Sequence, residues 1–399
     1  MEIVLASAVR TPIGAFMGAL APLPAPRLGA AAIRAAVARA GLEPDDVDQV
    51  VFGNVLAAGV GQAPARQAAI HAGLPTSVPA VTLNKMCGSG LEAIRQAARA
   101  VQVGDARIVV AGGMESMSNA PHLIPGSRGG LRLGNGTLID SLVHDGLWDA
   151  YEDAHMGACA DAAARERGIG RAEQDAFAER SYRRAQAAQA DGAAAHEIVP
   201  VEVPGRKGAV TVVDRDEGPD AVAFDRIPTL RPAFEADGTV TAANASTIND
   251  GAAAVVVTSC EEAERRGLPV LAVVRGFADH AHEPKRFPLA PEGALRSLFD
   301  RVGWRPEEVD RYEINEAFAV VTLAAMRTFD LDPERVDALG GAVSLGHPIG
   351  ASGARIVTTL LNALRLAEGR TGVAAICIGG GEALAVALER PDGGGDGAR

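Results

Sequence analysis

The chain repeats part of its own sequence, and this repeat constrains the fold more than any other feature. GLEPDDVDQVVFGNV at 41–55 and GWRPEEVDRYEINEA at 303–317 share glycine, proline, two acids, valine and aspartate in register. Downstream, CGSGLEAI at 87–94 matches GASGARIV, and AGGMES at 111–116 matches IGGGEA. Three matches in one order predict two halves of the same topology, packed about a pseudo-twofold axis. Ligand sites often lie where such halves meet.

Short apolar runs alternate with alanine-rich helical patterns along the 399 residues. QVVFGNV, ARIVVAGG, GAAAVVVTS and GVAAICIGG suit buried strands, whereas RLGAAAIRAAVARAG and GLEAIRQAARAV carry apolar residues at helical spacing. This alternation predicts an α/β protein. Because 48% of the residues are hydrophobic, the chain can bury a large core.

A region of different character separates the two halves. It is rich in glycine, proline and charge around one helical pattern near 172–190, and we expect it to form a subdomain that lies over the core. The predicted boundaries are 1–118 plus 249–268 for the N-terminal half, 119–248 for the insertion, 269–390 for the C-terminal half and 391–399 for a disordered tail.

Charge and cysteine usage exclude several classes of partner. The 50 acidic and 38 basic side chains give a net charge of -12, which argues against general binding to nucleic acid or anionic membranes. Four widely spaced cysteines without a CxxC pair suggest a reducing compartment and no zinc ribbon. No signal peptide or membrane-spanning run is recognised, so we expect a cytoplasmic protein without a membrane partner.

Cys87 stands at the start of a helical pattern. The apolar residues after it fall on one helical face, at Leu91, Ile94, Ala98 and Val101. Unpaired amides and the positive end of the helix dipole favour a thiolate there, so we expect a lowered thiol pKa and a possible nucleophile. A buried structural thiol is the alternative, and this position alone does not decide between them.

Three further corners carry polar or sulfur side chains. The repeat pairs the turn of His347, in GGAVSLGHPIGASGAR, with the turn of Cys87. A histidine in such a turn suits a general base or an oxyanion donor. Asn315 ends an expected strand in YEINEAF, and Cys377 ends another before three glycines whose amides could bind an oxyanion. A helix cap and a buried strand thiol are the alternatives for these two residues.

NKMCGSG, NEAF, GHPIGASGAR and CIGGGEA, in this order and at these spacings, resemble the four signature blocks of the thiolase family, in particular the acetyl-CoA acetyltransferases. The resemblance covers nearly the whole chain, from ASAVRTPIGAFMGAL to CIGGGEALAVAL. It implies a layered α-β-α-β-α fold made of two similar halves, with an inserted loop domain that binds CoA.

The resemblance also implies the roles of the catalytic residues. Cys87 would be the acylated nucleophile, His347 would activate it and contribute to an oxyanion hole, and Asn315 would hold a water in that hole. Cys377 would move the proton on the incoming acyl-CoA or the leaving enolate. The amides of Cys87 and Gly379 would form a second oxyanion hole. Two cysteines with distinct roles need no metal and no organic cofactor.

Contacts with the acyl-CoA substrate are implied in the same way. The expected residues are Leu147, His155, Met156, Phe234, Ala245, Ser246, Ala317 and Phe318. The small residues Gly88, Ser89 and Gly90 are expected to leave the room that a CoA thioester needs to reach Cys87. The segment before RPAF departs from the family pattern, so the nucleotide contacts depend on nearby basic candidates, Arg206, Lys207, Arg226 and Arg231.

The expected activity is a ping-pong interconversion of two acetyl-CoA with acetoacetyl-CoA and CoA, within fatty acid metabolism. A 3-ketoacyl-CoA thiolase for longer-chain or aromatic-pathway substrates is the first alternative. A non-catalytic acyl-CoA-binding or lipid-binding protein of the same fold is the second. Relatives are dimers or tetramers, and the loop at 123–141 resembles the family's tetramer-forming segment, so we expect a homotetramer or a homodimer.

Overall fold

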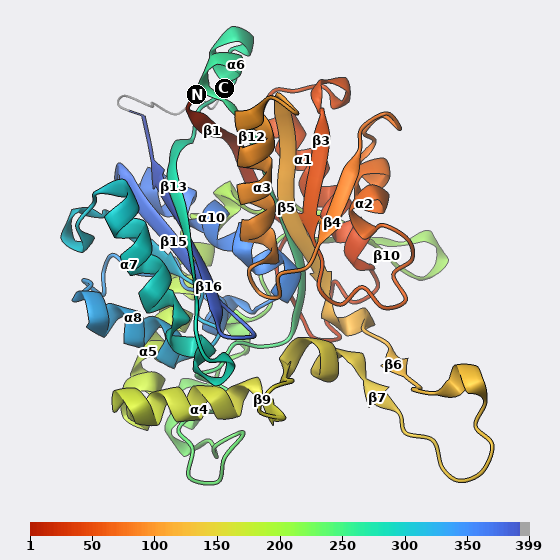
Figure 1. The fold of residues 1–399 in the computed structure, drawn as a ribbon, viewed down its shortest axis with the longest axis vertical. Coiled ribbons are helices and arrows are strands. Elements are labelled where there is room, and N and C mark those ends of the chain that lie inside the picture. Colours follow the sequence, from red (N-terminus) through yellow and green to blue (C-terminus); the bar gives the residue numbers. More distant parts are fainter. Residues whose placement is uncertain (392–399) are drawn as a thin grey trace.

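The computed structural model describes residues 1–391, so nearly all of the predicted tail lies outside the described residues. Its centre is a mixed sheet (Figure 1). The N-terminal half, which resumes after the inserted segment, supplies β1 (Ile3–Arg10), β2 (Gly14–Ala15), β3 (Gln49–Gly53), β4 (Ala80–Leu83), β5 (Ile108–Ser116) and β12 (Asn249–Ser259). Those from the second half are β13 (Ala272–Ala281), β14 (Arg311–Ile314), β15 (Thr371–Ile378) and β16 (Glu382–Glu389).

The strand order is nearly symmetric about the middle of the sheet. It runs β14-β15-β16-β13-β1-β12-β5-β3-β4, with β2 beside β12. The pair β3–β5 is parallel, as is β14–β15, whereas β5–β12 and β15–β16 are both antiparallel. β1 and β13 join the halves through Val4 opposite Val273 and Leu5 opposite Ala272. The repeated sequence therefore corresponds to repeated topology.

Helices cover both outer faces of the sheet and fill the space between its halves. The helices of the two halves are α1 (Ala25–Arg39), α2 (Pro64–Ala72), α3 (Ser89–Val103), α6 (Cys260–Arg266), α7 (Ala290–Val302), α8 (Ala319–Phe329), α9 (Ala342–Leu345) and α10 (Ile349–Leu366). Of these, α3 and α10 pack against each other between the two halves of the sheet.

The alternation of side chains between the two faces of each strand explains this layering. In β5, Val109 and Ala111 belong to the same buried cluster as α3 and α10, whereas Val110 belongs to the cluster of α1 and α2. In β15, Ile376 faces the inner helices and Ala375 faces α7 and α8. Since successive side chains point to opposite faces of a strand, each half of the sheet is covered by helices on both faces. The predicted layered α-β-α-β-α fold is confirmed.

The segment between β5 and β12 holds the remaining elements. They are α4 (Met156–Arg167), α5 (Arg171–Ala190) and the strand pairs β6 (His122–Leu123) with β7 (Ile139–Asp140), β8 (Trp148–Asp149) with β9 (Ala154–His155), and β10 (Val201–Pro204) with β11 (Val210–Val213). The expected helix near 172–190 is α5. β6 and β7 form the base of an arm that projects from the body (Figure 1). Within residues 1–391, no helix has the length and apolarity needed to cross a membrane.

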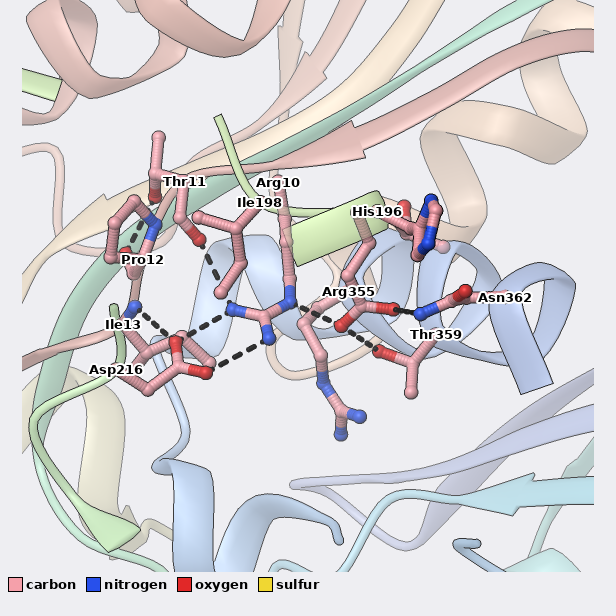
Figure 2. Close-up of polar contacts among 12 residues, drawn as sticks. Arg10, Thr11, Pro12, Ile13, His196, Ile198, Asp216, Arg355, Thr359 and Asn362 are labelled. Carbon is pink, nitrogen blue, oxygen red and sulfur yellow. Dashed lines mark hydrogen bonds and ion pairs between the residues drawn. The ribbon is translucent and has the colours of Figure 1, made fainter. Parts of the chain in front are cut away.

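A buried ion network ties this segment to the core (Figure 2). Arg10, at the end of β1, is 1% exposed and donates from Nε to Glu197 at 2.6 Å. Its Nη1 and Nη2 donate to the two carboxylate oxygens of Asp216 at 2.7 and 2.9 Å. Glu197 also accepts hydrogen bonds from Thr359 and Asn362 of α10, at 3.1 and 3.2 Å. The network therefore fixes two parts of the segment onto β1 and α10.

Candidate active site

Cys87 lies in a tight turn between β4 and α3. Met86 takes a left-handed conformation, φ 46°, and its N–H donates to Asn84 Oδ1 at 2.9 Å. Ser89 Oγ accepts from the N–H of Lys85 at 2.8 Å and donates to the carbonyl of Met86 at 2.7 Å. A left-handed non-glycine residue costs about 1–3 kcal/mol, and the hydrogen bonds of the turn hold it there. The half-buried thiol therefore stands two residues before the first residue of α3.

The thiol pKa of Cys87 is raised to about 11. Burial is the main cause, and the charge of Glu115 adds to it, while the N–H groups of Gly379 and of Cys87 itself act in the opposite direction. The prediction of a lowered pKa is therefore wrong. The helix N-terminus does favour a thiolate, but removing the sulfur from water disfavours it more strongly.

The small residues after Cys87 serve packing. A Cβ atom on Gly88 would lie 2.4 Å from Cδ1 of Ile378, and one on Gly90 would lie 2.6 Å from the backbone nitrogen of Ala354. Ser89 is completely buried and its hydroxyl closes the turn. The expectation that these residues leave room for a CoA thioester is wrong, because they let α3 approach β15 and α10.

His347 stands two residues before α10, as Cys87 stands two residues before α3. Its N–H donates to Asn249 Oδ1 at 3.0 Å, and its Nδ1 lies 2.6 Å from Ser352 Oγ. The Ser352 hydroxyl donates to the carbonyl of Pro348 at 3.0 Å. Because a hydroxyl carries one hydrogen, the proton between Nδ1 and Ser352 belongs to the imidazole, and Nε2 holds the lone pair.

His347 Nε2 is buried and has no hydrogen-bond partner among residues 1–391. The pKa of His347 is lowered to about 3, mainly by burial and secondarily by the positive charge of Arg355. The imidazole is therefore neutral at physiological pH, with a free lone pair on Nε2. Such a group can accept a proton and afterwards donate a hydrogen bond to an oxyanion.

Asn315 and Cys377 are completely buried. Asn315 follows β14, its Oδ1 accepts from Nη2 of Arg355 at 3.2 Å, and its Nδ2 finds no partner in the described part of the chain. Cys377 lies in β15, and its thiol pKa is raised by burial and by the neighbouring Cys87. The two cysteines are thus close enough to influence each other electrostatically, although 289 residues lie between them in the sequence.

A cavity of about 280 Å³ opens onto Cys87, His347 and Gly379. The residues expected to contact acyl-CoA all line it, namely Leu147, His155, Met156, Phe234, Ala245, Ser246, Ala317 and Phe318. Its described lining does not include Asn315 or Cys377. A larger hollow of about 790 Å³ along β4 and α3 has none of the predicted site residues in its described lining.

Several lining residues were missed by sequence reasoning. They are Met86, Met117, Gly146, Thr247, Ile248, Phe287 and Ile349. Thr247 and Ile248 directly follow the predicted Ser246, so the motif that indicated Ser246 could also have indicated them. Met117 and Ile349 come from a strand end and a helix start in opposite halves, and no local pattern brings them together.

The ring of Phe234 depends on a glycine that the sequence did not single out. Phe234 stacks on His155, with 4.6 Å between ring centroids. A Cβ atom on Gly157, in the first turn of α4, would lie 2.2 Å from that ring. Glycine at 157 therefore lets Phe234 take its place in the wall of the cavity.

The basic candidates for nucleotide contacts lie outside the described cavity lining. Arg206 and Lys207 follow β10, whose valines pack in the cluster of α1 and α2. Arg226 and Arg231 are exposed in the segment that leads to Phe234. Arg226 and Arg231 are closer in sequence to the cavity wall at Phe234 than Arg206 and Lys207 are.

Comparison with known proteins identifies the family. The model of the thiolase N-terminal domain matches residues 3–261, and that of the thiolase C-terminal domain matches residues 268–390. An acetyl-CoA acetyltransferase of Chromobacterium violaceum is 51% identical over 98% of this chain and 100% of its own length. One of Cupriavidus necator is 50% identical over 98% and 99%, and acetyl-CoA acetyltransferase 1 of Arabidopsis thaliana is 51% identical over 97% and 94%. This chain is an acyltransferase that belongs to the thiolase family.

Proposed function

We propose that the protein is an acetyl-CoA C-acetyltransferase, which interconverts two acetyl-CoA with acetoacetyl-CoA and CoA through an acyl-cysteine. One observation carries the proposal. The cavity that opens onto Cys87, His347 and Gly379 is lined by every residue expected to contact acyl-CoA. Curated relatives that share about half of its residues carry the name acetyl-CoA acetyltransferase.

The first half-reaction forms the acyl-enzyme. The sulfur of Cys87 attacks the thioester carbon while Nε2 of His347 takes the thiol proton, so that no free thiolate is needed at rest. The N–H groups of Cys87 and Gly379, which lie against the sulfur, stabilise the tetrahedral oxyanion. The carbon–sulfur bond of acetyl-CoA then breaks, and the departing CoA sulfur takes the proton from Cys377, which leaves a thiolate at Cys377 and a protonated His347.

The second half-reaction forms the carbon–carbon bond. The thiolate of Cys377 removes a proton from the methyl group of a second acetyl-CoA, and the enolate oxygen accepts hydrogen bonds from the protonated Nε2 of His347 and from a water held on Asn315 Nδ2. The enolate carbon attacks the acyl group on Cys87, the bond to the cysteine sulfur breaks, and that sulfur recovers its proton from His347, while Cys377 keeps the proton taken from the methyl group. All groups belong to the chain or to the substrates, so the scheme requires no metal and no organic cofactor.

A thiolysis series over 3-ketoacyl-CoA chain lengths tests the proposal. We expect the highest kcat/KM with acetoacetyl-CoA, and an acetyl group found on Cys87 by mass spectrometry after incubation with acetyl-CoA. Activity that rises beyond four carbons would instead support a 3-ketoacyl-CoA thiolase for longer substrates. Absence of turnover with every chain length, or acylation of Cys159 or Cys260 instead of Cys87, would refute the catalytic assignment.

We further infer a homotetramer in the cytoplasm that works in fatty acid metabolism. The projecting arm between β6 and β7 supports the assembly, because it exposes several leucines that lie outside the described lining of the active site. Widely spaced free cysteines support a reducing compartment. The expected use of acyl-CoA thioesters as substrates supports the role in fatty acid metabolism.

A further inference from the structure

The orientation of the Asn315 amide is decided by a single neighbour. Arg355 Nη2 donates to Asn315 Oδ1 at 3.2 Å. A guanidinium has only donors, so the oxygen must face Arg355 and the Nδ2 group must face away from it. The backbone of Asn315 is also fixed, because its N–H donates to the carbonyl of Ala375 at 2.9 Å and its carbonyl accepts from Ala317 at 2.8 Å.

The guanidinium that makes this contact is itself held in place. Arg355 is 2% exposed, and its Nη1 donates to Glu313 Oε2 at 3.1 Å. Glu313 and Asn315 are two residues apart at the end of β14, so their side chains point to the same side. One guanidinium from α10 therefore bridges both side chains, and the ion pair with Glu313 sets where Nη2 lies.

The same helix also holds the imidazole of the site. Ser352, three residues before Arg355 on α10, contacts Nδ1 of His347. Residues three apart in a helix lie on one face, so α10 presents the two groups that orient His347 and Asn315 side by side. The atoms left over are His347 Nε2 and Asn315 Nδ2, both buried and both without a partner within the described residues.

We propose that Arg355 is a positioning residue of the active site, which holds the Asn315 amide so that Nδ2 remains the donor available to the reaction. The inference rests on the function proposed above, because it requires a reaction step that uses Asn315.

A purely structural role for Arg355 makes a different prediction. The surrounding carboxyl groups of Glu313, Glu316 and Asp337 are fully buried, and burial raises the pKa of each. If Arg355 only balanced their charge, any cation opposite Glu313 would replace it. Lysine offers that charge, but it presents one nitrogen in place of the two that serve Glu313 and Asn315.

The test is a double-mutant cycle between Arg355 and Asn315 in the full chain. The pair Glu313→Gln with Arg355→Met removes the guanidinium without leaving a buried carboxylate unpaired. We expect kcat to fall about 10- to 100-fold in this variant and about 100-fold in Asn315→Ala, in the range for loss of one oxyanion donor. The combined variant should be no slower than Asn315→Ala alone, because the guanidinium acts through the amide.

Two further variants separate positioning from folding. Arg355→Lys should regain much of the thermal stability lost in Arg355→Met while kcat stays low. Arg10→Met is the matched control, since Arg10 is an equally buried guanidinium between two carboxylates and shares no hydrogen-bond partner with the neighbouring Arg355 among the described residues (Figure 2). Any loss of kcat in Arg10→Met should multiply with the loss in Asn315→Ala.

Each outcome decides the matter. If the losses at Arg355 and Asn315 multiply, if Arg355→Lys restores kcat, or if Arg10→Met shows the same coupling to Asn315, the positioning role is refuted while the proposed function stands. A wild-type protein without thiolysis activity at any chain length would refute the proposed function, and this inference with it.

Discussion

Cys87 and His347 are both uncharged in the resting site, because the surrounding protein shields each group from water. Burial raises the thiol pKa of Cys87 to about 11 and lowers the pKa of His347 to about 3. A pre-formed thiolate–imidazolium pair is therefore disfavoured, and the proton must pass from sulfur to Nε2 as the carbonyl carbon is attacked. The hydrogen bonds that remain open to the substrate, at Gly379 and at His347 Nε2, are suited to a charge that exists only during the reaction.

The pH dependence of Cys87 alkylation tests this view. Iodoacetamide reacts with the thiolate, whose fraction rises tenfold per pH unit below the pKa. With a pKa of about 11, the rate should rise about tenfold per unit from pH 7 to pH 10 without levelling off. The measurement is mass spectrometry of the peptide that carries Cys87, with free cysteine as the control. A plateau below pH 8 would show that the helix N-terminus outweighs burial.

At the scale of the element, the end of β5 joins the two halves of the site. Both oxygens of Glu115 act as double acceptors. Oε1 accepts from Asn54 Nδ2 at 2.7 Å and from the N–H of Leu56 at 3.2 Å, and Oε2 accepts from the N–H groups of Val55 and Gly350 at 3.0 Å each. One carboxylate thereby ties the loop after β3 to the first turn of α10. The strand end thus supports the helix that follows His347.

Replacement of Glu115 by glutamine should destabilise the fold although the two side chains have the same shape. The new NH₂ group would face two N–H donors, which would lose their acceptor inside the protein. We expect a loss of about 3 kcal/mol in the free energy of unfolding, measured by urea denaturation, together with a lower kcat. Glu308→Gln removes a carboxylate that accepts from an exposed arginine, and it should leave the unfolding midpoint unchanged. Equal stability of the Glu115→Gln variant and the wild type would contradict the proposed clamp.

At the scale of the whole molecule, the arm between β6 and β7 exposes a group of leucines. Leu131, Leu133 and Leu138 are 60%, 101% and 62% exposed. Leucines gathered on a projecting segment are typical of a surface that another chain covers. None of these three belongs to the described lining of the active site. The arm therefore fits a role in assembly.

Replacing these three leucines by serine should change the assembly and leave the chemistry intact. We expect light scattering to give four chains for the wild type and two for the variant, because the arm contacts would lose most of their apolar area. Turnover per chain should remain within about twofold, since the lining of the cavity is unchanged. A wild-type particle of two chains, or a variant that keeps four, would contradict this assignment.

The internal repeat and the four motifs were enough to predict much of this protein. Matches such as CGSGLEAI with GASGARIV predicted that α3 and α10 would be equivalent helices, and hence that Cys87 and His347 would stand at equivalent turns. The expected contacts at Phe234 and Ser246 also line the cavity. The positions of these residues could be anticipated because repeat register and motif spacing are properties of the chain itself.

Other features depended on atoms far apart in the sequence. The pKa of Cys87, the packing role of Gly88 and Gly90, and the contribution of Met117 and Ile349 to the cavity were beyond local patterns. Desolvation and close packing are sums over neighbours that only the folded chain assembles. The sequence by itself determined which residues stand at the turns. The tertiary structure decided their protonation states and their free hydrogen-bonding atoms, because both depend on what surrounds each group.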